Sequence, residues 1–128
     1  MLKIVIEGNP ITKKNHGRII QKRLGNGKTI PIMLPSEAFT KYEQHCKQFM
    51  PTLDNPIDYP INLKCTYYME TRRKCDITNL LQATCDILVK YKIIDDDNYT
   101  IISSIDGTNV QYDKDNPRTI IEITKKED

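Results

Sequence analysis

Residues 76–91 constrain the fold most, because their apolar side chains repeat with the period of an α-helix. On a helical wheel of about 100° per residue, one arc is mostly apolar and the opposite side is polar. The apolar arc contains Ile77, Leu80, Leu81, Thr84, Ile87, Leu88 and Tyr91, and the polar side contains Asp76, Asn79, Gln82, Asp86 and Lys90. We therefore expect an amphipathic helix that packs one face on a sheet.

Segments in which apolar side chains recur at every second residue lie before and after this helix in the sequence, and they predict the strands of that sheet. Residues 2–7 alternate apolar and polar side chains before the turn Gly8-Asn9-Pro10, and residues 61–70 alternate directly before the helix. The strands expected after the helix are residues 99–104, 109–112 and 119–124. Strands mixed with helices in this order predict an α+β fold with a mixed β-sheet.

A second helix and a β-hairpin are expected between the first two main strands. Ser36 can cap a helix over about residues 37–50. The β-prone residues 18–24 and 28–33 flank Gly25-Asn26-Gly27, which can supply the positive φ angles of a hairpin turn. The expected architecture is a sheet with two packed helices and a projecting hairpin.

The length of 128 residues suits one domain, so we expect a single domain over residues 1–128. No window approaches the roughly 18–20 consecutive apolar residues that a membrane helix needs, and the first residues lack the pattern of a signal peptide. These features predict a cytoplasmic protein with no membrane partner. Without a CxxC pair, a zinc cluster is not expected. We expect the cysteines to be small buried residues, namely Cys46, Cys65, Cys75 and Cys85.

Positive charge is concentrated in the N-terminal part of the chain. Residues 1–50 contain nine Lys or Arg against three acidic residues, and residues 51–128 contain ten against fourteen. Residues 13–28 contain no acidic residue, which suits a phosphate backbone better than a neutral ligand. The basic residues of this run are Lys13, Lys14, Arg18, Lys22, Arg23 and Lys28. The alternative is a solvated basic hairpin without a ligand.

Three charged motifs around the helix of residues 76–91 suggest a metal site. They are the triplet Arg72-Arg73-Lys74, the helix start Asp76-Ile77-Thr78-Asn79 and the acidic run Asp95-Asp96-Asp97. Mg²⁺ prefers carboxylate and water oxygens, and a nuclease uses it to polarise a phosphoryl oxygen and to activate water. The alternative is that Asp76 stabilises the helix dipole and that the acidic run is solvated.

Spacing alone does not decide between these alternatives. The helix spans roughly 24 Å at about 1.5 Å per residue. Asp76 and Asp97 therefore meet only if the chain doubles back along the helix, or if a neighbouring strand brings them together.

The order of these motifs resembles the RusA family of crossover (Holliday) junction endodeoxyribonucleases, which occurs in phages and prophages. The resemblance runs from Arg72-Arg73-Lys74-Cys75-Asp76-Ile77-Thr78-Asn79-Leu80 through Asp86-Ile87-Leu88 to Ile93-Ile94-Asp95-Asp96-Asp97. That family has basic residues, then Asp-x-Asp-Asn-Leu, a Lys three residues after the Asn, an Asp-x-Leu later in the helix, and an Asp-Asp pair beyond it. The resemblance implies a RusA-like α+β fold and a homodimer that resolves four-way DNA junctions by paired symmetric nicks, with Mg²⁺ or Mn²⁺ as the cofactor.

The same resemblance implies roles for individual residues. Asp76 and Asp97 match the family's metal carboxylates, and Asp96 is the other member of the acidic pair, so these three are the expected catalytic and metal-binding residues. The family's second Asp falls on Thr78 and its Lys falls on Gln82. A Thr adds no charge, and a Gln cannot stabilise a developing negative charge as an ammonium does.

Other residues are candidates to rebuild the site. Asn79 and Asp86 share the polar helix face, Glu70 ends the preceding strand, and Lys14 is a candidate for the missing cation. The expected DNA contacts are Lys13, Lys14, Arg18, Lys22, Arg23, Lys28, Arg72, Arg73 and Lys74. Two alternatives remain open: a dimer that binds branched DNA without cutting it, and a small acidic-patch interaction protein that binds no nucleic acid.

Overall fold

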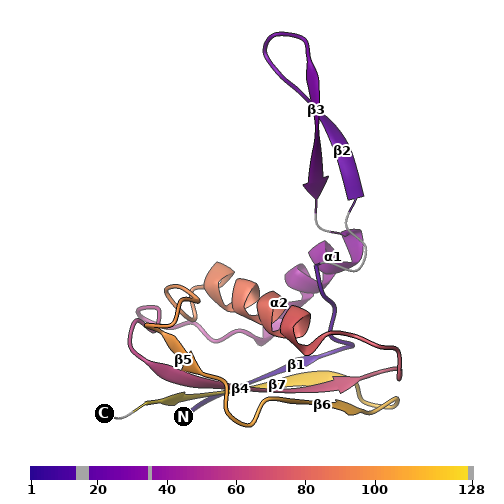
Figure 1. The fold of residues 1–128 in the computed structure, drawn as a ribbon. Coiled ribbons are helices and arrows are strands. Elements are labelled where there is room, and N and C mark those ends of the chain that lie inside the picture. Colours follow the sequence, from indigo (N-terminus) through magenta and orange to yellow (C-terminus); the bar gives the residue numbers. More distant parts are fainter. Residues whose placement is uncertain (14–17, 35, 127–128) are drawn as a thin grey trace.

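The computed structural model describes residues 1–13, 18–34 and 36–126, and it confirms the predicted α+β fold. A five-stranded sheet carries two α-helices on the same face (Figure 1). The strands of this sheet are β1 (Leu2–Glu7), β4 (Ile61–Met69), β5 (Ile102–Ser104), β6 (Asn109–Tyr112) and β7 (Arg118–Lys125). The other elements are β2 (Arg18–Arg23), β3 (Thr29–Leu34), α1 (Glu37–Cys46), the 3₁₀ helix η2 (Lys47–Phe49) and α2 (Ile77–Lys90).

Strand β4 is the centre of a mixed sheet. On one side β4 pairs antiparallel with β7, which pairs antiparallel with β1. On its other side β4 pairs in parallel with β5 near Ile61 and with β6 near Met69. Parallel neighbours need a crossover connection, and α2 provides it between β4 and β5. Helix α2 therefore begins just beyond the end of β4, which places the charged triplet and Asp76 together at that end of the sheet.

The core lies between the helices and one face of the sheet, as the alternation of buried residues shows. The inward residues of the strands are Ile4 and Ile6 on β1, Ile61, Leu63, Cys65 and Tyr67 on β4, and Thr119, Ile121 and Ile123 on β7. The helices contribute Phe39 and Cys46 from α1, and Leu80, Ala83, Thr84, Ile87 and Leu88 from α2. Burial of this continuous apolar surface is what holds α2 and its polar outer face in position.

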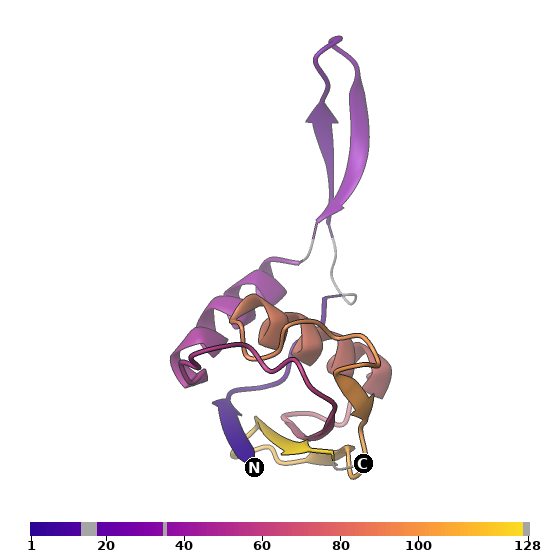
Figure 2. The ribbon, with the colours of Figure 1, turned by 90° about the vertical axis from the view of Figure 1, so that its left-hand side faces the viewer.

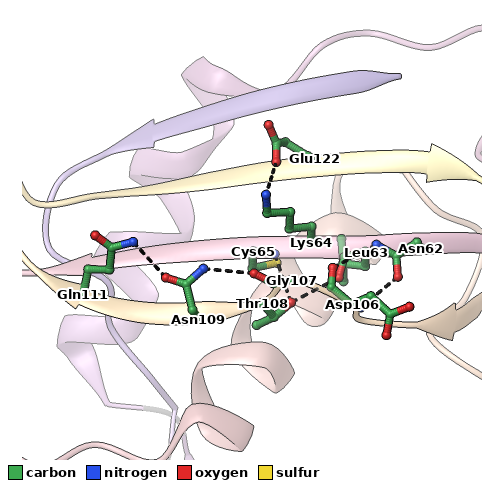
Figure 3. Close-up of polar contacts among 10 residues, drawn as sticks. All are labelled: Asn62, Leu63, Lys64, Cys65, Asp106, Gly107, Thr108, Asn109, Gln111 and Glu122. Carbon is green, nitrogen blue, oxygen red and sulfur yellow. Dashed lines mark hydrogen bonds and ion pairs between the residues drawn. The ribbon is translucent and has the colours of Figure 1, made fainter.

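An ion pair joins β4 to β7 on the face of the sheet away from the helices (Figure 3). Lys64 on β4 lies with its Nζ 3.5 Å from Glu122 Oε2 on β7. The stem of Lys64 passes close to Gly107, where a Cβ would lie 3.0 Å from Lys64 Cδ. Gly107 has a φ of 89°, which also favours glycine. Close packing therefore fixes the turn between β5 and β6.

Strands β2 and β3 form a separate two-stranded ribbon that projects away from the sheet (Figures 1 and 2). They pair antiparallel from Arg18↔Leu34 to Arg23↔Thr29. The Leu24 N–H donates to the Lys28 carbonyl oxygen at 2.7 Å, and Gly27 in the turn has a φ of 82°. The hairpin predicted from the sequence is thereby confirmed.

Some local predictions were wrong. Helix α1 ends at Cys46 and tightens into η2, instead of continuing to residue 50. The strand expected over residues 99–104 is only Ile102–Ser104, because the Asn98 carbonyl oxygen accepts the N–H groups of Ile101 and Ile102 and turns the chain.

Burial also differs from prediction at a few positions. Ile77 is 39% exposed, since burial along α2 begins one turn later. Cys46 and Cys65 are fully buried as predicted, but Cys75 and Cys85 are only half-buried. In the described ranges, no helix has the length and apolar character needed to cross a membrane.

Candidate active site

Asp76 occupies the N-cap position of α2 without capping the helix through its side chain. Its backbone carbonyl accepts the N–H groups of Asn79 and Leu80, whereas its carboxylate makes no capping hydrogen bond. From the described residues, the carboxylate accepts a long hydrogen bond, 3.5 Å from the Asn79 side-chain amide. An exposed carboxylate that the helix does not use for capping is available to a ligand.

The acidic run at residues 95–97 is part of an ordered turn. The Asp96 carboxylate accepts the Asp97 N–H at 2.8 Å and the Asn98 side-chain amide at 2.7 Å. These two donors, the Asp97 N–H first, hold the pKa of Asp96 below its ordinary value. Asp96 is therefore an anion that organises the turn and orients Asp97.

Asp97 meets the polar face of α2 at Gln82. The Gln82 Nε2 donates to Asp86 Oδ1 at 3.1 Å and lies 3.5 Å from Asp97 Oδ2. The chain after α2 thus doubles back along the helix, but only as far as Gln82. Asp76 lies about 9 Å further along the helix axis at about 1.5 Å per residue.

A lysine from the N-terminal segment joins this group. Lys13 Nζ lies 2.9 Å from Asp86 Oδ2, on the oxygen that Gln82 does not use. The groove around this contact is lined by Lys13, Glu43, Asp86, Val89, Lys90, Asp96 and Asp97. The arrangement brings carboxylates from α2 and from the following turn to one hollow, together with an ammonium from a third segment.

The chemistry of these side chains suits a hard cation, but their arrangement in one chain does not complete a site for it. Within residues 1–13, 18–34 and 36–126, no three His, Cys, Asp or Glu side chains form a group that could hold a metal ion. Asp96 and Asp97 are neighbours in the turn, whereas Asp76 lies at the start of α2. Both Asp96 oxygens are also engaged in hydrogen bonds. No reaction step can therefore be assigned to a metal from this arrangement.

The predicted basic triplet lies at the start of α2 and is exposed. The Arg72 guanidinium stacks over the Tyr112 ring, with 4.1 Å between its central carbon and the ring centroid. Arg73 and Lys74 line a hollow together with residues 9–12 of the N-terminal segment. This hollow thus connects the basic triplet with the residues that precede Lys13, and its lining also includes Glu70.

Other residues named from the sequence have simpler surroundings. Thr78 is exposed in the first turn of α2. Glu70 is exposed, and its N–H donates to Asn9 Oδ1 at 2.9 Å, which ties the N-terminal segment to the end of β4. Lys22, Arg23 and Lys28 are exposed on the ribbon, in agreement with a surface role. Arg18 lies in β2, and Lys14 lies outside the described residues.

Two contacts of the site were not predictable from the sequence. Lys13 was expected only as one member of a basic run, and nothing indicated its pairing with Asp86. Tyr112 was not singled out, because an isolated tyrosine on a short strand carries no local signal of an arginine above it. Both contacts join segments that are distant in the sequence.

Comparison with known protein families gives one match over most of the chain. The model of the family described as endodeoxyribonuclease RusA matches residues 7–124. The matched region includes β1's last residue, the ribbon, both helices and nearly all of β7. No curated protein matches the chain.

Proposed function

Because this chain belongs to the RusA endodeoxyribonuclease family, we propose that it resolves four-way (Holliday) junctions in DNA by paired symmetric nicks. The family match over residues 7–124 is the observation that carries the proposal. The order of the charged motifs around α2 supports it. Asp76, Asp96 and Asp97 are the proposed catalytic residues.

The basic surfaces are proposed to hold the DNA. The ribbon residues Lys22, Arg23 and Lys28 are exposed, and a two-stranded ribbon has the dimensions to follow a groove of duplex DNA. Contacts of Lys and Arg with phosphates fix the position of a protein on DNA without reading its sequence. We assign Lys13, Lys14, Arg18 and the triplet Arg72-Arg73-Lys74 to the same task.

We propose that cleavage requires Mg²⁺ or Mn²⁺, with carboxylates of Asp76, Asp96 and Asp97 as ligands. Carboxylate oxygens are the donors that these ions prefer. Since Asp76 and Asp97 lie apart along α2, the proposal requires them to approach when the DNA substrate binds. Asn79 and Asp86 are the nearest further oxygen donors on the same face of the helix.

The working form is proposed to be a cytoplasmic homodimer in which residues 1–128 of each subunit form one domain. A four-way junction has approximate two-fold symmetry, and a dimer with the same symmetry presents identical sites to two opposite strands. Paired nicks in opposite strands are the expected product of such an arrangement. No membrane partner is proposed.

The test is a gel assay of the purified protein on a synthetic mobile four-way junction, with and without Mg²⁺ or Mn²⁺. Linear duplex DNA of the same sequence is the control substrate. We expect cleavage of the junction only in the presence of metal, and Asp76→Asn and Asp97→Asn should each abolish it. Junction binding should be kept or tightened in both variants, because a carboxylate that repels phosphate is removed. Cleavage by both variants at the wild-type rate would remove these residues from the proposed site.

The second candidate function is a dimer that binds branched DNA without cutting it. Thr78 and Gln82 favour this candidate, because both are uncharged at positions where the family resemblance expects an Asp and a Lys. Specific binding of the junction in the gel assay, with no product at any metal concentration, would support this candidate instead.

A further inference from the structure

The groove beside α2 holds more negative than positive charge. Its acidic residues come from α1, from α2 and from the following turn, and are Glu43, Asp86, Asp96 and Asp97. Two lysines face them, and one of these, Lys90, is paired with Glu43. Among the residues that line this groove, Lys13 is thus the cation that pairs with Asp86. A DNA phosphate that enters here meets repulsion from the carboxylates unless a cation offsets it.

Lys13 is held at a defined place in this groove. Its ammonium lies 2.9 Å from Asp86 Oδ2, and it also lies 5.6 Å from the centroid of the buried Phe39 ring. The preceding residue Thr12 is buried, which fixes the backbone where the side chain begins. A lysine held at both its base and its tip loses little further conformational entropy when it binds a ligand.

The Lys13 ammonium keeps binding capacity beyond its contact with Asp86. An ammonium has three N–H donors, and the lysine side chain is 41% exposed. Gln82 occupies the other oxygen of Asp86 and also contacts Asp97, so Lys13 lies on the side of Asp86 that opens to the groove. The cation thus lies in the groove that Asp97 also lines, and it is not enclosed by protein atoms.

We infer that Lys13 contacts the phosphate of the bound DNA strand in this groove, and that Asp86 is the positioning residue that holds the ammonium there. Gln82 provides no charge on the same face of α2, so Lys13 supplies the positive charge at this point of the site. This inference rests on the proposed function, because it takes branched DNA as the ligand.

The simpler alternative is that the ion pair between Lys13 and Asp86 only ties the N-terminal segment to α2. The salt dependence of junction binding, measured without divalent metal, separates the two. Loss of one phosphate contact lowers the log–log salt slope by about 0.9. We expect that reduction in Lys13→Ala and in Lys13→Gln, and a slope like that of the wild type in Lys13→Arg. A smaller reduction is expected in Asp86→Asn, because the Lys13 ammonium is then no longer held at its place in the groove.

Cleavage of the junction gives a second, independent readout. We expect Lys13→Ala to lower the cleavage rate by about 10²-fold, the usual effect of removing one group that stabilises a transition state. The double variant Lys13→Ala/Asp86→Asn should be as slow as Lys13→Ala. If Lys13 served only to neutralise Asp86, removal of both charges would restore the rate.

The matched control is Lys3→Ala, because Lys3 is exposed on β1 and its neighbours Ile4 and Ile6 face the helices. Its salt slope and cleavage rate should equal those of the wild type. An unchanged slope and rate in Lys13→Ala, with a wild-type protein that binds and cuts junctions, overturns the inference and leaves the proposed function intact. A wild-type protein that neither binds nor cuts a four-way junction overturns both.

Discussion

The Tyr67 hydroxyl oxygen lies 2.7 Å from the Thr84 hydroxyl oxygen, and this buried hydrogen bond joins the central strand β4 to α2. The Thr84 hydroxyl donates to the Leu80 carbonyl oxygen at 3.0 Å, so it accepts from Tyr67. Tyr67 is 1% exposed and Thr84 is 5% exposed. The bond therefore fixes the position of the helix whose outer face carries Asp76, Gln82 and the groove.

The direction of this hydrogen bond predicts an asymmetry between two substitutions. Tyr67→Phe removes the donor and leaves Thr84 bonded to Leu80, so it should lower the free energy of unfolding by about 1 kcal/mol. Thr84→Val keeps the volume but removes the oxygen acceptor of the buried Tyr67 hydroxyl, which should cost about 1–3 kcal/mol. Urea unfolding of the two variants measures the difference. An equal or larger loss for Tyr67→Phe would show that the assigned donor is wrong.

The turn that carries Asp97 should lose stability in acid. The Asp97 N–H and the Asn98 amide lower the pKa of Asp96 in the folded state. Ionised Asp96 therefore contributes fully to the free energy of unfolding above the unfolded-state pKa of about 4. This contribution is lost as the pH falls through the folded-state pKa of Asp96. The variant Asp96→Asn keeps an acceptor oxygen but cannot titrate. The difference in unfolding free energy between wild type and Asp96→Asn should therefore be largest near neutral pH, and it should be smaller at a strongly acidic pH, where Asp96 is protonated in the folded state as well. A difference that is the same at both pH values contradicts the assignment.

The sequence predicted the elements of the fold well, because the burial pattern of each element follows its own periodicity. Strand β7 shows this most clearly, with Thr119, Ile121 and Ile123 buried in alternation. The order and pairing of strands were not predictable. The parallel contact of β6 with β4 depends on the path of the chain after α2, and no local pattern encodes that path.

The candidate site was predictable in composition more than in geometry. The sequence indicated that Asp76 and Asp97 meet only if the chain doubles back along the helix or a neighbouring strand brings them together. In the structure the chain after α2 doubles back only as far as Gln82. The sequence also did not decide which residue supplies the cation that is missing at Gln82, and Lys14 was the candidate. The ammonium found beside Asp86 is that of Lys13, because the N-terminal segment is placed by burial of Thr12 and by the hydrogen bond of Asn9 with Glu70, just after β4.

The ribbon should contribute to DNA affinity through charge alone. If Lys22, Arg23 and Lys28 contact phosphates, their joint replacement by Ala should weaken binding of all DNA sequences alike. The log–log salt slope should fall by up to about 0.9 for each lost contact. Fluorescence anisotropy with junctions of different sequence, over a series of salt concentrations, measures both effects.

A control for the ribbon replaces exposed lysines elsewhere, for example in Lys3→Ala/Lys126→Ala. This variant should bind with nearly the wild-type slope, since neither lysine lies on the ribbon. If the ribbon variant also keeps the wild-type slope, the ribbon does not contact DNA, and its basic side chains serve only as a solvated surface.

The last prediction concerns Gln82, where the family resemblance expects a lysine. The Gln82 amide lies within 3.5 Å of carboxylate oxygens of both Asp86 and Asp97, so the ammonium of Gln82→Lys would lie between two negative charges. Gln82 is exposed on the polar face, so the longer side chain costs little in packing.

Because Lys13 already faces Asp86, the gain in cleavage from Gln82→Lys should be small in the wild type and large in Lys13→Ala, where a new cation replaces a lost one. We expect Gln82→Lys to recover most of the roughly 10²-fold loss in that background, measured as the single-turnover rate on a four-way junction. No recovery would mean that Lys13 acts from a position that residue 82 does not reach. If neither the wild type nor Gln82→Lys combined with Thr78→Asp cuts a junction in Mg²⁺ or Mn²⁺, the endonuclease proposal must give way to a protein that binds branched DNA without cutting it.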